Sequence, residues 1–211
     1  KVDPTRSAKQ VTAMYRDIEE RYLGIKRALK ALFDQRLTGR DREVNRHNWH
    51  FLCHDHGEDM RLYQVNAGKF IYDMSAQELA DLLEAVQGIL DDYLLEGGEQ
   101  NLWAMDYVVA EAQRGTLEAF NNLSQQSQVY ASQTTLQQLL SSPGHLNQVA
   151  AARLTTFSDW KVISDTARGD LTNIITDAVA RGVNPRETAS VISKRLDVSM
   201  SKAKTIAQTE Q

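Results

Sequence analysis

The stretch TRSAKQVTAMYRDIEERYLGIKRALKALFDQRL, residues 5–37, decides the fold. Its apolar residues recur at alternating spacings of four and three, which places them along one side of an α-helix. These residues, called here the N-terminal stripe, are Val11, Tyr15, Ile18, Tyr22, Ile25, Leu29 and Leu32. Charged residues such as Arg16, Glu20 and Lys26 fall outside the stripe. The sequence therefore predicts one long amphipathic helix whose stripe binds either the chain's own core or a partner.

Two more helices are predicted in the middle of the chain. Ser75 and Glu78 form a capping box, which opens a helix, and Gly97 with Gly98 favours its end. The apolar side of this helix contains Leu79, Leu82, Leu83, Val86, Ile89, Leu90, Tyr93 and Leu94. The next helix is predicted from Asn101, and its apolar side contains Leu102, Met105, Val108, Val109, Ala112, Leu117, Phe120 and Leu123.

The remaining segments carry weaker patterns. Residues 38–62 lose helical periodicity, and residues 62–74 hold two short β-like runs around Asn66 and Gly68, which predict a small hairpin. Residues 121–138 are rich in Asn, Ser, Gln and Thr and form either a polar helix extension or a linker. The sequence Ser-Pro-Gly at 142–144 predicts a break. Short helices are predicted beyond it, over 171–180, from Asn184 to about 196, and from Ser199 onward.

These elements predict a mainly α fold. It is a multi-helix assembly with a long N-terminal amphipathic helix and one small β-hairpin. The expected parts are the N-terminal helix (1–37), an acidic helical body with the hairpin (38–123), a polar linker (124–145) and a small C-terminal helical lobe (146–211).

Composition excludes several classes of protein. The 211 residues contain 7% aromatic residues and three prolines, which disfavours a β-sandwich or barrel. The single cysteine, Cys53, excludes an internal disulfide framework. No apolar run approaches the roughly 20 residues of a membrane span.

The net charge of −4 is segregated into +5 over residues 1–46, −11 over 47–145 and +2 over 146–211, so the segments are expected to have different neighbours. The first residue is lysine and not methionine, so the sequence is expected to be a trimmed or partly observed polypeptide.

One local cluster of residues suits a metal ion. Four of the five histidines and the only cysteine fall within residues 47–56, and His50, Cys53, His54 and His56 have the donor atoms that zinc accepts. Their spacing matches no standard zinc finger, and no second Cys/His pair follows at the required distance. The alternative is a polar loop whose histidines meet the neighbouring acidic residues Asp55, Glu58 and Asp59. No cofactor is predicted.

Catalytic motifs are missing from the sequence. It contains no Gly-rich phosphate loop, no Walker motif and no nucleophile elbow. The carboxylate pairs Asp91–Asp92 and Glu58–Asp59 have no partner base in the pattern. The chain is therefore predicted not to be an enzyme.

The basic N-terminal segment offers a nucleic-acid interpretation. Its cations could follow a phosphate backbone, and they are Arg6, Lys9, Arg16, Arg21, Lys26, Arg27, Lys30, Arg36, Arg40, Arg42 and Arg46. Acidic residues alternate with them, so a solvated helix with ion pairs one turn apart also explains the pattern. A non-specific DNA-binding accessory protein is the alternative function.

Three separated segments together resemble one protein family. The first is Asp3-Pro4-Thr5-Arg6 and the YLGIK run at 22–26. The second is WAMDYVVAEAQRG at 103–115, with Trp103, Tyr107 and Gly115. The third is Asn184-Pro185 followed by KAKTIAQTE at 202–210, with Ala203, Ile206, Thr209 and Glu210. Together and in this order they resemble the head morphogenesis, or minor head, proteins of tailed bacteriophages, the Mu F-like group. Lys202 and Gln208 stand where that family often has arginine.

The resemblance implies a low-copy structural virion protein that is present in multiple copies within one assembly. Its implied partners are the portal protein, other capsid components and packaged DNA, without a membrane. Its implied location is the capsid interior near the portal vertex, and the host cytoplasm during assembly. It would act in procapsid assembly, with a further role in DNA packaging or ejection. The N-terminal stripe is the expected partner surface. Thr209 and Glu210 are read either as a helix cap with a surface ion pair or as residues that position the domain against its neighbours.

Overall fold

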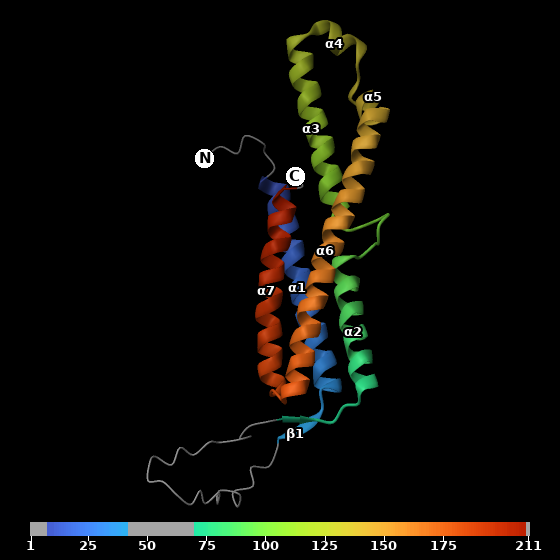
Figure 1. Cartoon of the computed structure of the whole chain (residues 1–211). Coiled ribbons are helices and arrows are strands. Elements are labelled where there is room, and N and C mark those ends of the chain that lie inside the picture. The colour runs from blue at the N-terminus through green and yellow to red at the C-terminus, as the bar shows by residue number, and fades with distance from the viewer. Residues whose placement is uncertain (1–7, 42–69, 210–211) are drawn as a thin grey trace, which may run out of the picture.

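Helices dominate the residues that the computed structural model describes, 8–41 and 70–209 (Figure 1). The elements in these residues are α1 (Ala8–Arg36), β1 (Gly39–Asp41), β2 (Phe70–Tyr72), α2 (Ala76–Leu94), α3 (Met105–Gln126), α4 (Gln128–Gln133), α5 (Leu136–Leu140), α6 (Pro143–Arg181) and α7 (Pro185–Thr209). The predicted mainly α class, with a long N-terminal helix and one small antiparallel β element, is confirmed. None of these described helices is both long and apolar enough to cross a lipid bilayer.

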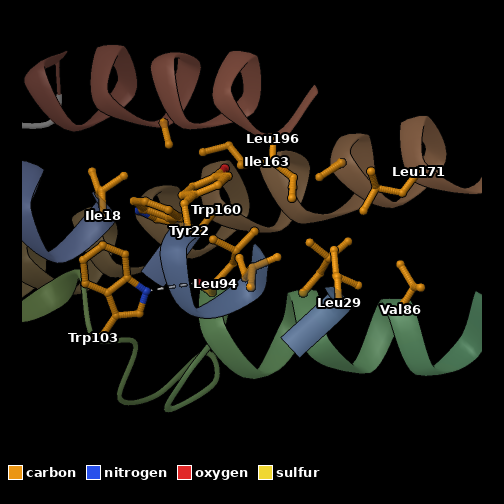
Figure 2. Close-up of a cluster of buried hydrophobic side chains, with 14 of the residues drawn as sticks. Ile18, Tyr22, Leu29, Val86, Leu94, Trp103, Trp160, Ile163, Leu171 and Leu196 are labelled. Carbon is orange, nitrogen blue, oxygen red and sulfur yellow. Dashed lines mark hydrogen bonds between the residues drawn. The ribbon is translucent and has the colours of Figure 1, made fainter. Parts of the chain in front are cut away.

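Four of the helices form a bundle around one hydrophobic core. α1 packs against α2 and α7, and α6 packs against the same two helices from the other side (Figure 1). Trp160 of α6, Tyr22 of α1, Leu94 of α2 and Leu196 of α7 all belong to this core and are almost completely buried (Figure 2). The predicted C-terminal lobe at 146–211 is therefore not a separate unit, because its two helices supply half of the bundle.

The N-terminal stripe faces this core. Ile18, Tyr22, Ile25 and Leu29 are at most 1% exposed, whereas Val11, Tyr15 and Leu32 are only half-buried. The helix buries Met14 and Phe33 toward its ends instead. Between Met14 and Phe33, five intervals separate the buried positions over 19 residues. Their mean spacing is therefore longer than the 3.5 residues of a strict alternation of four and three. The stripe is thus covered by the chain itself, which corrects the expectation that it forms a free partner surface.

α1 and α2 approach each other closely at one glycine. A Cβ atom added to Gly24 would lie 2.3 Å from Cε1 of Tyr93 on α2. Any larger residue at position 24 would therefore push the two helices apart or displace the tyrosine ring.

Helix starts match the capping signals in part. The Ser75–Glu78 capping box is present as predicted, with the Ser75 Oγ accepting from the Glu78 N–H at 3.2 Å. α3 begins at Met105 rather than Asn101, because the turn before it buries Leu102 and Trp103 in the core.

The Ser-Pro-Gly sequence starts a helix rather than interrupting one. Ser142 caps α6 by accepting from the His145 N–H, and Pro143 occupies the first helical position, where a missing N–H costs nothing. α6 then runs for 39 residues, so the predicted linker at 124–145 and the short helices after it are corrected. The polar residues 121–138 extend the helical structure through the end of α3, α4 and α5.

α7 is also one helix where two were predicted. Ser199 was expected to cap a new helix, but it lies inside α7 and its Oγ is 2.7 Å from the Tyr22 hydroxyl. The side chain joins α7 to α1, so it does not compete for the backbone of its own helix. The predicted helix end after residue 180 is confirmed, because Gly182, with φ 67°, ends α6.

The small sheet closes one end of the bundle. β1 and β2 pair antiparallel, with Arg40 opposite Ile71. The predicted hairpin was centred on residues 66–68, which lie outside the described residues, and the partner of β2 is residues 39–41. The Phe70 N–H also donates to the Gly182 carbonyl at 2.7 Å. This bond fixes the sheet to the turn between α6 and α7.

The upper part of Figure 1 is a second structural region, called here the arm, residues 112–155. It consists of most of α3, then α4 and α5, and the first turns of α6. α3 and α6 run antiparallel in it and return the chain to the bundle (Figure 1). The arm therefore projects from the bundle as a helical hairpin.

Candidate interaction surfaces

A groove of about 880 Å³ lies between α1 and α7, beside the sheet. Its floor is apolar and is formed by Leu29, Phe33, Leu37, Phe70, Ala189, Ile192 and Leu196. α1 and α7 pack against each other, and Ala189, a small residue of α7, is one of the residues that line the groove. An apolar floor in an open groove between two helices is typical of surfaces that accept a helical or extended segment.

The rim of this groove is charged. Lys26, Lys30, Asp34, Asp41 and Arg186 stand around it. The Lys26 Nζ lies 2.7 Å from a carboxylate oxygen of Asp197, and the Lys30 Nζ lies 2.5 Å from one of Asp34. Because exposed ion pairs of this kind are worth little, the rim can exchange these partners for charges on a ligand.

The basic residues of α1 do not form a uniform phosphate-binding row. Arg21 is mostly buried, and its guanidinium stacks 4.1 Å from the Trp103 ring centre and lies 2.7 Å from a Glu96 carboxylate oxygen. Glu19 of α1 is bound by Lys204 of α7 at 2.5 Å. Arg6, Arg42 and Arg46 lie outside the described residues. Arg21 is thus part of the bundle's internal bonding rather than a contact for DNA.

Two aromatic residues of the resemblance, Trp103 and Tyr107, lie at joints of the bundle. The Trp103 Nε1 donates to the Leu94 carbonyl at 3.1 Å, and its ring meets Trp160 edge-on with centres 4.7 Å apart (Figure 2). The Tyr107 hydroxyl donates to Asp17 at 3.3 Å. Burial first, and the Asp17 carboxylate second, raise the pKa of Tyr107. These aromatic residues fix the turn between α2 and α3 to α1 and α6.

The other residues of the resemblance divide between joints, the arm and undescribed segments. The Asn184 Oδ1 accepts from the Arg186 N–H at 2.9 Å, and Pro185 begins α7. Ala203 is completely buried and Ile206 is half-buried. Gly115 lies in the arm, where an added Cβ would have no atom within 4 Å. Thr209 ends α7, and Asp3, Pro4, Thr5, Arg6 and Glu210 lie outside the described residues.

The candidate metal ligands His50, Cys53, His54 and His56 also lie outside the described residues, so the choice between a metal cluster and a polar loop is not tested. Within residues 8–41 and 70–209, no three His, Cys, Asp or Glu side chains group together as a metal site would require. Asp91 accepts from Ser164 at 2.8 Å and from Gln87 at 2.6 Å, and so joins α2 to α6. Asp92 is exposed.

Sequence reasoning missed two features. The groove needs α7 beside α1, which no local pattern reveals. A buried carboxylate, Glu111, is bound by Arg114, which also contacts Glu118 at 3.0 Å. The hydrogen bond that Arg114 donates to Glu111 raises the pKa of the Arg114 guanidinium. The spacing of three and four residues was the available signal for this network.

No protein-family model, curated protein or solved structure matches the chain. The resemblance to minor head proteins therefore rests on the motifs quoted above, and the geometry of the surfaces has to be interpreted on its own.

Proposed function

We propose that the chain is a structural minor head protein of a tailed bacteriophage. In this proposal it binds the portal protein at one capsid vertex, acts in procapsid assembly, has a further role in DNA packaging or ejection, and works without catalysis. The motifs at 103–115, 184–185 and 202–209 support the family by their order along the chain, and Trp103, Tyr107, Asn184 and Ala203 lie at joints of one bundle. The observation that carries a binding role is the α1–α7 groove.

The groove suits an amphipathic segment of a partner protein. Phe33 and Ile192 offer buried apolar surface at its floor, and Lys30 and Arg186 offer exposed charge at its rim. A helix laid into such a groove would bury its apolar side and place acidic flanking residues near the rim cations. The N-terminal stripe contributes to this surface only through Leu29.

DNA binding is the second candidate, and the distribution of charge favours it. α1 has seven basic and four acidic residues, and α7, packed beside it, has five and two. α2 has five acidic residues and no basic one. The bundle therefore has a positive side formed by α1 and α7, which also borders the groove.

Filling the groove tests the portal proposal. Ala189→Phe places a ring in the groove, whereas Val191→Phe adds a ring of the same size at a position of α7 that is 50% exposed. We expect Ala189→Phe to abolish co-purification of the full chain with the portal protein of the same particle, and Val191→Phe to retain it. Circular dichroism melting of both variants would verify that the bundle is folded.

Two outcomes would count against this function. Retention of the portal by a folded Ala189→Phe variant would remove the groove from the interaction. If both variants still bind the portal, and the DNA affinity of the chain falls steeply with salt, the accessory DNA-binding function is favoured instead.

A further inference from the structure

The side of α2 that faces away from the core is acidic. Glu84 and Asp92 are exposed there, and neither has an ion-pair partner among residues 8–41 and 70–209. Gly88 lies four residues from each of them and is exposed, and a Cβ atom added to it would have no atom within 4 Å. α2 therefore presents two carboxylates eight residues apart, with open space between them.

The side of α7 that faces away from the core has a matching row of cations. Lys194, Val198 and Lys202 follow one another at intervals of four, and all three are exposed. Neither lysine has an ion-pair partner in the part of the chain that the structure describes. Glu187 is also exposed but lies in the first turn of α7, about 10 Å before Lys194. The two lysines thus have the same spacing as the two carboxylates of α2.

The exposed cations of α1 form a less uniform row. Arg16 and Arg27 are exposed on its outer side, but Glu20 and Asp34 are exposed with them. Lys30 already forms an ion pair with Asp34. α7 is therefore the better complement for the acidic side of α2.

The two rows cannot meet within one molecule. α1 and α6 each pack against both α2 and α7, so α2 and α7 occupy opposite corners of the bundle (Figure 1). The core lies between them, and their charged rows face in opposite directions. The complementary charges of α2 and α7 can therefore pair only between two copies of the chain.

Contacts with α1 give the relative levels of the two rows. α2 and α7 both begin at the sheet and run in the same direction (Figure 1). Gly24 of α1 lies against Tyr93 of α2, and Tyr22, two residues earlier, is hydrogen-bonded with Ser199 of α7. A residue of α7 thus lies level with the α2 residue whose number is about 105 lower.

We propose that copies of this chain associate side by side, with the outer side of α7 of one copy against the outer side of α2 of the next. With the bundles at the same level, Lys194 lies near Gly88 of the neighbouring copy, between Glu84 and Asp92. The open space at Gly88 accommodates the lysine side chain. Lys202 lies little more than one helical turn beyond Asp92.

This contact joins two different surfaces, so it can repeat from copy to copy in a ring or an open row. Exposed ion pairs contribute little individually and are screened by salt, so the association should be weak and should decrease as salt rises. The contact goes beyond the proposed portal function, and it uses none of the residues that line the α1–α7 groove.

Sedimentation velocity of the full chain, at several concentrations in about 20 mM and about 0.5 M salt, tests the contact through two charge reversals. The α7 reversal is Lys194→Glu with Lys202→Glu, and the α2 reversal is Glu84→Lys with Asp92→Lys. We expect wild type to self-associate in low salt, and each reversal alone to raise the Kd by at least about tenfold. An equimolar mixture of the two reversals should associate again, because each reversed row meets an opposite charge on the other variant.

The matched control is Arg16→Glu with Arg27→Glu on α1. It changes the net charge by the same amount as the α7 reversal, at two exposed cations that also lack an ion-pair partner within the described ranges. This control should keep the self-association of wild type. Circular dichroism melting of all variants would verify that each bundle is folded, as expected for substitutions at exposed positions.

Three results would overturn the proposal. They are a wild-type chain that stays monomeric at every concentration in low salt, a mixture of reversals that does not associate, and a control that disrupts association as strongly as the α7 reversal. A monomeric chain whose DNA affinity falls with the α7 reversal would assign these lysines to DNA instead. The Ala189→Phe variant separates this proposal from the portal function, since it should lose the portal and keep the self-association.

Discussion

The bundle and the arm share helix α6, but its side chains have different surroundings in the two regions. In the bundle, α6 buries Trp160, Leu171 and Ile175 against three other helices, while in the arm the first thirteen residues of the same helix bury none. Charged side chains surround the bundle and tie its helices together, as Asp170 and Arg195 do at 2.7 Å. Residues 119–152 of the arm contain no Asp, Glu, Lys or Arg.

This difference indicates that the bundle supplies the stability of the fold, whereas the arm exposes apolar surface. A region that buries its apolar residues within the chain is stable by itself and can display a groove on its surface. A region that leaves them exposed keeps apolar surface available to another molecule. The two regions should therefore respond very differently to heat, denaturant and concentration.

Hydrogen exchange should show the largest contrast between the regions. Amides in the buried parts of α1 and α2 should exchange only through global opening, at a cost of about 5–15 kcal/mol. Amides of the arm should exchange many orders of magnitude faster in dilute protein, because local opening there exposes little apolar surface. Mass spectrometry of peptic fragments would measure both. Equal protection of 119–152 and α2 in dilute protein would erase the distinction between the regions.

Matched leucine truncations should give the next largest contrast. Leu90→Ala in α2 removes a completely buried side chain and should lower the free energy of unfolding by about 2–5 kcal/mol. Leu154→Ala in the arm truncates a side chain that is 60% exposed and should cost less than about 0.5 kcal/mol in the monomer. Urea unfolding followed by the fluorescence of Trp103 and Trp160 would measure both variants. Similar losses would mean that the arm contributes to the same core.

Local signals in the sequence predicted those features that local physics determines. The centre of the N-terminal stripe, the Ser75 capping box, the glycine end of α6 and the Asn184 start of α7 were all identified correctly. In each case a backbone hydrogen bond, a positive φ or a helical repeat within a few residues decides the structure. The mainly α class follows from these same signals.

Tertiary contacts decided the features that the sequence did not reveal. Ser199 has the properties of a helix cap, but Tyr22 binds its hydroxyl across 177 residues, and α7 continues. The apolar pattern of α3 continues to Leu123, yet only its first part is buried, because the bundle ends near Glu111. The groove depends on α1 and α7 lying side by side, so Ala189 and Ile192 could not be identified from their local pattern.

Alkaline pH should lower the free energy of unfolding of the bundle, because Tyr22 ionises. We expect this effect to be smaller than the contrasts between the bundle and the arm. Burial raises the pKa of Tyr22 from 10 to about 12, partly offset by the hydrogen bond with Ser199. A raised pKa in the folded state means that this contribution to stability is complete below pH 10 and is lost as the pH rises toward 12. The loss should be about 1.4 kcal/mol per pH unit over this window, or about 2.7 kcal/mol in total.

Tyr22→Phe is the control for this pH effect, because it keeps the ring and removes the ionisable hydroxyl. At pH 7 the free energy of unfolding of the variant should be about 1 kcal/mol lower than that of wild type, because the variant lacks the hydrogen bond with Ser199. The difference in unfolding free energy between wild type and variant, measured in urea from pH 8 to 12, isolates Tyr22 from every other group that titrates there. We expect the variant to become the more stable protein above about pH 11. A difference that stays constant to pH 12 would show that Tyr22 ionises without disturbing the core, and that the bundle is less tightly closed around this residue than its burial indicates.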